Sequence, residues 1–173
     1  GLAEAGASVV VVDINEKNAK STASEIEQNY GNTALGIDCD VADPVSVKKM
    51  VDVVTEKFGQ INILHNNAAA KSSDLEAYFT PFEEYSLSKW REIMSVNLDG
   101  MFLVAQAVGK QMVIQGTGGS IIQTSSIYGV LAPDNSIYEG SNYLGRKINT
   151  PAVYSASKSA VIGLTKYLAT YWA

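Results

Sequence analysis

Residues 8–37 read SVVVVDINEKNAKSTASEIEQNYGNTALGI and predict a strand, a helix and a second strand. Residues 8–12 form an apolar run, which is typical of a parallel strand covered on both faces, and the run ends in Asp13. Asn15 is a good N-cap for a helix that continues to about Tyr30, and residues 33–37 have the composition of a short strand. Two strands joined by a helix are the unit from which parallel sheets are built.

Strands and helices continue to alternate along the chain. Asp43-Pro44 starts a helix that Gly59 stops, because an N-cap followed by proline favours helix entry and glycine favours helix exit. Residues 61–64 and 120–124 are expected to form the third and fourth strands. The remaining expectations are a helix end at residues 1–6 capped by Gly6, a loop at 71–85 with a helical turn after Thr80-Pro81, and a long helix from Ser86 or Ser88 to about Gln115.

This order of elements predicts an α/β fold. Strands that alternate with helices of ten or more residues imply right-handed crossovers and a parallel sheet. We therefore expect a doubly wound, Rossmann-like sheet between helices in three layers, with residues 1–173 in a single domain. Ligands bind such sheets beyond the carboxyl ends of the strands. The polar residues expected to meet at that edge are Asp13, Asp40, Asn66, Asn67, Ser125 and Ser126.

Tyr154 and Lys158 are the residues best suited to chemistry. They lie four apart in a predicted helix, so both side chains share one face. Thr150 is expected to be the N-cap of this helix, with Pro151 at its first position and its end at Leu168. An ammonium beside a phenol stabilises the phenolate, so Tyr154 could exchange protons at neutral pH. The same spacing also occurs in surface pairs without a catalytic role.

Composition excludes several classes of function. The 173 residues carry a net charge of -5 without a basic stripe, which argues against nucleic-acid partners. No apolar run reaches the length of a membrane span, and no signal peptide is evident, so no membrane partner is expected. The single cysteine cannot form an internal disulfide, and the single histidine leaves no metal cluster. These features predict a cytoplasmic protein without a structural metal.

Four motifs occur in the order found in one enzyme family. They are Asn66-Asn67-Ala68-Ala69, Val96-Asn97, Ser125-Ser126 and Tyr154-x-x-x-Lys158. Together they resemble the short-chain dehydrogenase/reductase family across essentially the whole sequence. The first motif departs from the family's N-N-A-G in having Ala69 at its last place.

The resemblance implies a hydride transfer between a nicotinamide cofactor and a secondary alcohol or carbonyl of a small polar substrate. Tyr154 would be the general acid or base, and Lys158 would stabilise its anion and hold the nicotinamide ribose. Ser126 would donate a hydrogen bond to the substrate oxygen. Asn97 would hold a water that links Lys158 to solvent.

The residues at the strand ends also bear on the choice of cofactor. A carboxylate at Asp13 would accept hydrogen bonds from the adenosine ribose and repel a 2'-phosphate, so NAD is favoured over NADP. By resemblance, Asp40 and Val41 would lie beside the adenine, and Asn67, Ala68 and Ala69 would line the floor of the cofactor site. Two alternatives remain: Asp13 could be only a helix-entry acid, and Asp40 only a turn former.

The sequence departs from the family pattern in two places. The family's first strand and its T-G-x-x-x-G-x-G loop are missing before Gly1, and its last strands are missing after Ala173, so we expect a fragment of a longer protein. In addition, Ser126 and Tyr154 are 28 positions apart, farther than is usual in the family. The additional segment, residues 131–149, would contact a polar substrate such as a sugar, in a surface-sugar pathway. Alternatively, it would only pack on a neighbouring subunit or lie on the surface.

Other functions remain open from the sequence. A sugar-nucleotide epimerase or dehydratase of the extended family shares the Tyr-x-x-x-Lys motif, and a truncated chain could be non-catalytic. The resemblance further implies a homotetramer or homodimer, in which the helices containing Asn97 and Tyr154 pair between subunits.

Overall fold

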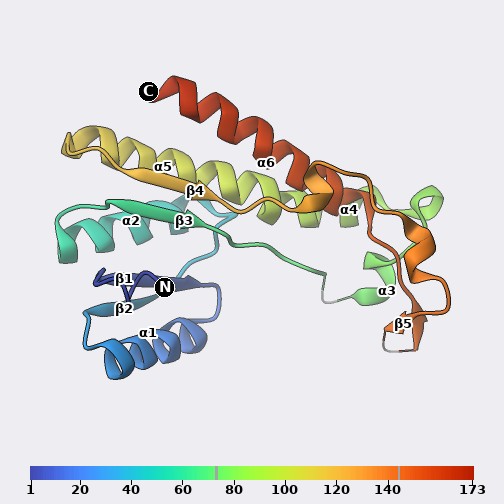
Figure 1. The fold of residues 1–173 in the computed structure, drawn as a ribbon, viewed down its shortest axis with the longest axis horizontal. Coiled ribbons are helices and arrows are strands. Elements are labelled where there is room, and N and C mark those ends of the chain that lie inside the picture. The colour runs from blue at the N-terminus through green and yellow to red at the C-terminus, as the bar shows by residue number, and fades with distance from the viewer. Residues whose placement is uncertain (73, 144) are drawn as a thin grey trace. The chain divides into compact units, whose positions relative to one another are not determined.

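The computed structural model describes residues 1–72, 74–143 and 145–173. The chain divides into two compact units: residues 1–64 with 103–120, and residues 65–102 with 121–173. We describe each unit by itself. Figure 1 labels most of their helices and strands.

The first unit is built on the strand–helix–strand segment that opens the sequence. Strands β1 (Val9–Asp13) and β2 (Ala34–Asp38) pair in parallel, with Val9 opposite Ala34. Helix α1 (Glu16–Tyr30) packs on both strands (Figure 1). The Asn15 side chain accepts hydrogen bonds from the first turn, and Gly31 ends the helix in the left-handed region. The predicted strand–helix–strand order is therefore confirmed.

The packing of α1 on β2 depends on small residues. Ala19 and Ala23 of α1 are buried. A Cβ atom built on Gly36 would lie 2.5 Å from the backbone of Ala19 and Lys20. Only glycine permits this approach, so Gly36 sets the distance between the strand and the helix.

Helix α2 (Pro44–Phe58) also follows the sequence prediction. The Asp43 carboxylate accepts hydrogen bonds from the backbone of residues 45 and 46, and Gly59 ends the helix with a φ of 78°. The buried face carries Val47, Met50, Val51 and Val54. This is the helical spacing of apolar residues from which the helix was predicted.

Strand β3 (Ile63–Asn66) pairs with β4 (Ser120–Gln123) and begins two residues later than predicted. The reason lies in Gln115 at the end of α5 (Met101–Gln115). Its side chain accepts a hydrogen bond from the Ile61 N–H at 3.0 Å and donates one to the Ile61 carbonyl at 2.7 Å. The Ile61 backbone is satisfied by this side chain, so the strand starts after it.

The second unit contains a helical segment that the sequence analysis predicted as continuous. Helix α4 (Leu87–Met94) begins after the N-cap Ser86 and passes into a π-helical turn, Ser95–Gly100, before α5. Two short helical elements precede it, α3 (Leu75–Tyr78) and a 3-10 turn at Phe82–Glu84. The 3-10 turn confirms the turn expected after Thr80-Pro81, whereas α3 was missed.

Helix α6 (Ala152–Tyr171) carries the Tyr154-x-x-x-Lys158 motif. The prediction that Thr150 is its N-cap is wrong, because Pro151 occupies that position without a side-chain hydrogen bond. The Thr150 hydroxyl instead lies 2.9 Å from the hydroxyl of Tyr138. The helix also extends three residues beyond the predicted end at Leu168.

A buried cluster holds the start of α6. Val153 is fully buried and packs in a cluster with Tyr78 and Ile93. Partly buried residues surround this cluster: Phe79, Tyr85, Trp90 and Met94. The N-terminal turn of α6 is thereby attached to α3 and α4 by apolar contacts.

The segment 131–149 has its own local structure. A 3-10 turn spans Asn135–Tyr138, and two short strands, β5 (Asn142–Tyr143) and β6 (Arg146–Lys147), form an antiparallel pair. The segment contacts α3 through the Tyr143 ring, which meets Phe79 edge-on, and through Asn149, which donates to the Phe79 carbonyl.

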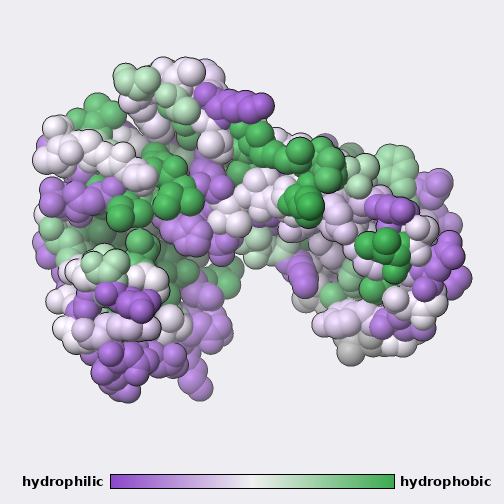
Figure 2. All heavy atoms as spheres, in the orientation of Figure 1, coloured by the Kyte–Doolittle hydropathy of each residue, from purple (hydrophilic) through white to green (hydrophobic). Residues whose placement is uncertain are grey.

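Two further features complete the description. At the start of the chain, Ala5 N–H bonds the Gly1 carbonyl, and Gly6 has a φ of 94°, as expected for the end of a helical turn. Figure 2 shows hydrophobic residues gathered in several patches on the face that it presents. None of the helices in the described ranges is long and apolar enough to cross a membrane.

Candidate active site

Tyr154 and Lys158 lie one turn apart on α6, which is anchored by the fully buried Val153 and Val161. The Lys158 side chain is 4% exposed, and its Nζ donates a hydrogen bond of 2.8 Å to the Thr124 carbonyl. Tyr154 is half-buried. A lysine ammonium has three N–H donors, and within the described residues only one of them has a partner. The other two remain for a ligand.

The loop that follows β4 is fixed against the turn of α6 that carries Lys158. Ser125 Oγ donates to the Lys158 backbone carbonyl at 2.7 Å, and Ser159 Oγ donates to the Gly129 carbonyl at 2.8 Å. A Cβ atom on Gly129 would lie 2.7 Å from both the Lys158 carbonyl oxygen and Ser125 Oγ. The loop and the helix are therefore in backbone contact at the site.

Ser126 stands at the start of the 3-10 turn Ile127–Gly129. Its Oγ accepts a hydrogen bond of 3.2 Å from the Tyr128 N–H. This bond orients the hydroxyl and leaves its proton available, because a serine hydroxyl both accepts and donates. The serine is half-buried, and the apolar residues that follow it are exposed: Ile127, Val130 and Leu131.

Asn97 lies inside the π-helical turn and is 1% exposed. Its Oδ1 accepts a hydrogen bond of 2.8 Å from the Ala70 N–H, which ties the loop after β3 to this helix. Its Nδ2 is buried without a hydrogen-bond partner in the described part of the chain. π-turns occur often at functional sites, and an unpartnered buried amide group is suited to bind water.

Residues 67–69 follow β3 as predicted and are exposed. The preceding Asn66 is buried and donates through Nδ2 to the Met101 carbonyl at 2.8 Å. The loop is thus held on both sides, by Asn66 and by the Ala70–Asn97 bond. Asn67, Ala68 and Ala69 present their surfaces to solvent between these two attachments.

Three predicted cofactor residues belong to the first unit, whereas Tyr154 belongs to the second. Asp13, at the end of β1, is half-buried and accepts a hydrogen bond of 2.8 Å from the Asn15 N–H through Oδ1. Asp40 is exposed and accepts from the Ala42 N–H at 2.9 Å, and Val41 is half-buried. Each carboxylate therefore makes the helix-entry or turn contact considered from the sequence. In the described ranges, the second oxygen of each has no hydrogen-bond partner.

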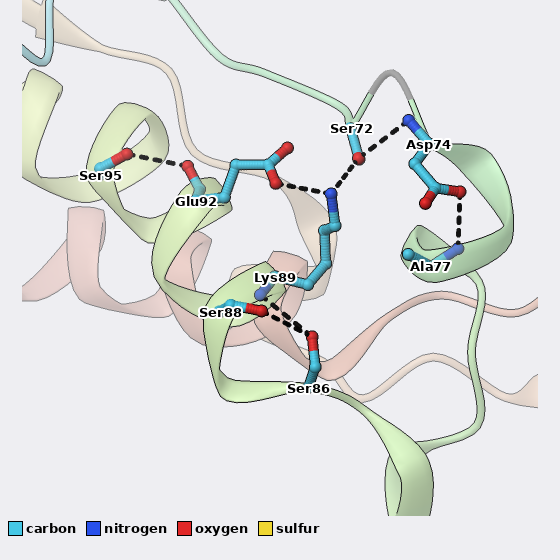
Figure 3. A network of polar contacts seen from close by, with 8 residues as sticks. All are labelled: Ser72, Asp74, Ala77, Ser86, Ser88, Lys89, Glu92 and Ser95. Carbon is cyan, nitrogen blue, oxygen red and sulfur yellow. Dashed lines mark hydrogen bonds and ion pairs between the residues drawn. The ribbon is translucent and has the colours of Figure 1, made fainter.

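A polar network around Lys89 was not found from the sequence (Figure 3). Lys89 Nζ donates to Ser72 Oγ at 2.6 Å and contacts Glu92 Oε2 at 2.5 Å. Ser72 is buried and also accepts from the Asp74 N–H at the start of α3. The spacing of Lys89 and Glu92 on α4 indicates an ion pair, but no sequence signal identifies the Ser72 partner. The network connects Ser72 and the N-cap of α3, Asp74, to α4.

Two aromatic features lie in the same unit as Tyr154: a cleft lined mainly by aromatic side chains, and the buried side chain of Tyr78. The cleft has a volume of about 200 Å³ and is lined by Phe82, Tyr85, Leu87, Trp90 and Ala152. Burial raises the pKa of Tyr78 to about 12, with smaller contributions from Tyr85 and Tyr154. Tyr78 is therefore a neutral phenol within electrostatic reach of Tyr154. None of the predicted site residues lines the cleft.

The chain is similar in sequence to known proteins over its whole length. The family model of the short chain dehydrogenases matches residues 1–173. The chain belongs to the short-chain dehydrogenase family. It is 36% identical over 167 residues to the D-threitol dehydrogenase of Mycolicibacterium smegmatis, and the match covers 96% of this chain and 55% of that protein.

Solved structures of this family are similar throughout the chain. An NAD+-bound xylitol dehydrogenase is 30% identical with a TM-score of 0.80, covering 98% of this chain and 56% of that one. A gluconate 5-dehydrogenase from Burkholderia cenocepacia, in complex with NADP and tartrate, is 34% identical with a TM-score of 0.80. The match covers 99% of this chain and 58% of that one. The chain thus spans little more than half the length of these relatives. These matches confirm both the resemblance and the predicted three-layer α/β class.

Proposed function

We propose that this chain carries the catalytic residues of a nicotinamide-dependent dehydrogenase that oxidises a secondary alcohol or reduces the corresponding carbonyl. The observation that supports this most is the buried Lys158, which the Thr124 carbonyl holds one helical turn from Tyr154. A buried ammonium requires compensating partners; the Thr124 carbonyl supplies one, and two N–H donors remain for Tyr154 or a bound ligand. A surface pair would not need the hydrogen bond to Thr124.

Tyr154 is the proposed acid or base. In the oxidation, its phenolate accepts the proton of the substrate hydroxyl as the C–H hydrogen leaves with its electron pair. The nicotinamide ring, when bound, supplies the acceptor for that hydride. In the reverse direction, Tyr154 donates the proton to the carbonyl oxygen. Lys158 stabilises the phenolate in both directions.

Ser126 is proposed to hold the substrate oxygen. Its Oγ already accepts from the Tyr128 N–H, so the hydroxyl proton is free to be donated. Negative charge builds on the substrate oxygen during the reaction, and a donor aimed at it lowers the barrier. Asn97 is proposed to bind a water through Nδ2, which would connect Lys158 to solvent.

NAD is the proposed cofactor, in preference to NADP. One observation in each unit supports this choice: Lys158 retains two N–H donors, and Asp13 retains a carboxylate oxygen suited to ribose hydroxyls. A 2'-phosphate would be repelled by the Asp13 charge. We further propose that Asp40 and Val41 contact the adenine, and that Asn67, Ala68 and Ala69 line the cofactor site.

The proposed substrate is a small polyhydroxy compound. The similar proteins named above are a D-threitol, a xylitol and a gluconate dehydrogenase, which motivates this class. Segment 131–149 runs between Ser126 and Tyr154, so we propose that it borders the substrate. Assembly into a homodimer or homotetramer, a cytoplasmic location and a single domain over residues 1–173 stay predictions.

The test uses the full-length protein with NAD+ and a panel of D-threitol, xylitol and gluconate. We expect NADH formation with at least one of them, and a loss of at least roughly a hundredfold in kcat for Tyr154→Phe with NAD+ binding retained. Tyr167→Phe, an exposed residue on the same helix, is the matched control and should leave kcat unchanged. Turnover by Tyr154→Phe at the wild-type rate would refute the mechanism.

Cofactor preference is tested separately with Asp13→Ser. The variant removes the charge that opposes a 2'-phosphate, so the ratio of kcat/KM for NAD+ over NADP+ should fall by roughly tenfold or more. An unchanged ratio would show that Asp13 is only the helix-entry acid seen in its bond to Asn15.

A further inference from the structure

The segment 131–149 is tied back to the chain by a row of three hydroxyl groups. The Tyr138 hydroxyl lies 3.2 Å from that of Tyr128 and 2.9 Å from Oγ1 of Thr150. Tyr128 precedes the segment and Thr150 follows it. A residue inside the segment therefore links the two positions at which the segment leaves and rejoins the rest of this unit.

Both of these positions are themselves held in place. Tyr128 donates its N–H to Ser126 Oγ, and the neighbouring Gly129 is bonded to α6 through Ser159. Thr150 precedes the buried Pro151, and the next turn buries Val153 in the aromatic cluster. The hydroxyl row thus bridges two anchored parts of the unit.

The bridge also joins the two parts that carry the reacting groups. Tyr128 is two residues from Ser126, and Thr150 is four residues from Tyr154. In the proposed reaction one substrate oxygen contacts both the Ser126 hydroxyl and the Tyr154 phenol. Catalysis then depends on the separation of these two groups, since a displacement of about 1 Å lowers a rate by roughly a hundredfold.

We propose that Tyr138 is a positioning residue, whose hydroxyl holds the Ser126 segment and the Tyr154 segment at the separation that a substrate oxygen requires. This inference rests on the proposed function. Tyr138 does not touch the reacting atoms in this arrangement; it acts through Tyr128 and Thr150.

The test compares Tyr138→Phe, Thr150→Val and the double variant in the full-length protein. Phenylalanine keeps the ring and removes only the hydroxyl, and valine keeps the shape of threonine. We expect each single variant to lower kcat about tenfold with the Kd for NAD+ within about twofold of wild type. The double variant should be no slower than either single one, because both changes break the same bridge. Tyr167→Phe is again the control.

Two results would overturn the proposal. One is a Tyr138→Phe enzyme whose kcat equals that of the wild type when it is assayed at a temperature at which the variant is folded. The other is a double variant whose loss equals the product of the two single losses, which would mean that the hydroxyls act independently. If Tyr154→Phe also retains wild-type turnover, the proposed dehydrogenase function fails as well, and the two failures are thereby distinguished.

A second measurement does not depend on turnover. Amide hydrogen exchange in Tyr138→Phe should become faster both at residues 126–129 and at residues 150–154, because the bridge connects them. In Tyr167→Phe neither segment should change. Faster exchange in only one of the segments, or in neither, contradicts a bridge between them.

Discussion

Replacing Gly129 with alanine tests the contact between the loop after β4 and α6. The new Cβ would lie 2.7 Å from the Lys158 carbonyl oxygen and from Ser125 Oγ, and 2.8 Å from the Lys158 carbonyl carbon. These distances are several tenths of an ångström shorter than ordinary contacts. Because one side of the contact is helix backbone, the loop and the helix must move apart.

The expected magnitude follows from what this movement breaks. Overpacking costs about 1–3 kcal/mol, and the hydrogen bonds of Ser125 to Lys158 and of Ser159 to Gly129 contribute about 1 kcal/mol each. We expect the free energy of unfolding to fall by about 3–5 kcal/mol. Lys158 also moves relative to Thr124, so kcat should fall roughly tenfold to a hundredfold.

Urea denaturation and steady-state kinetics of the full-length protein measure both effects. Gly163→Ala is the matched control, because it lies on the same helix and its Cβ would meet nothing within 4 Å. That variant should gain about 0.5–1 kcal/mol of stability, since alanine favours a helix interior. The reasoning is refuted if Gly129→Ala keeps wild-type stability and activity, or if Gly163→Ala loses as much as Gly129→Ala.

Three further predictions concern other parts of the chain. Gly36→Ala places a Cβ 2.5 Å from the backbone of α1. We expect this change to lower the free energy of unfolding by about 3 kcal/mol and the Tm by roughly 10 °C. An unchanged melting curve would contradict this prediction. Burial raises the pKa of Tyr78 to about 12, and the unfolded phenol ionises near 10, so stability should fall as pH rises from about 10 toward 12. The denaturation midpoint of Tyr78→Phe should depend less on pH in this range than that of the wild type. An equal pH dependence in the two proteins would argue against a buried, neutral Tyr78 phenol. Burial also raises the pKa of the Cys39 thiol, so its reaction with a disulfide reagent at pH 8 should be slow until urea unfolds the protein; rapid labelling of the folded protein would disprove this.

Local signals in the sequence were sufficient for most of the helices. Asn15 and Asp43 cap α1 and α2 as predicted, and Gly31 and Gly59 end them. A cap involves residues two to four positions apart, so the sequence contains both partners of the interaction. The order of strands and helices, and the family motifs placed on them, followed from the same short-range patterns.

Two of the errors, at Thr150 and Ile61, occurred where a residue outside the local pattern contacts the group concerned. Threonine is a favoured N-cap residue, but Pro151 occupies the N-cap position of α6, and the Thr150 hydroxyl is hydrogen-bonded to that of Tyr138. Isoleucine is a favoured strand residue, but the side chain of Gln115, 54 positions away, forms hydrogen bonds with both the N–H and the carbonyl of Ile61. Neither partner can be identified from spacing, because the chain brings them together only when it folds.

The amino-acid sequence therefore determines the α/β class, most of the helix boundaries and the identity of the candidate site residues. These features depend on periodicity, caps and motifs within a few positions of one another. The folded chain decides the environment of those residues: the burial of Lys158 against Thr124, the contact of Gly129 with α6, and the bridge through Tyr138. Each of these joins segments that are far apart in sequence, so each depends on distances that only packing sets.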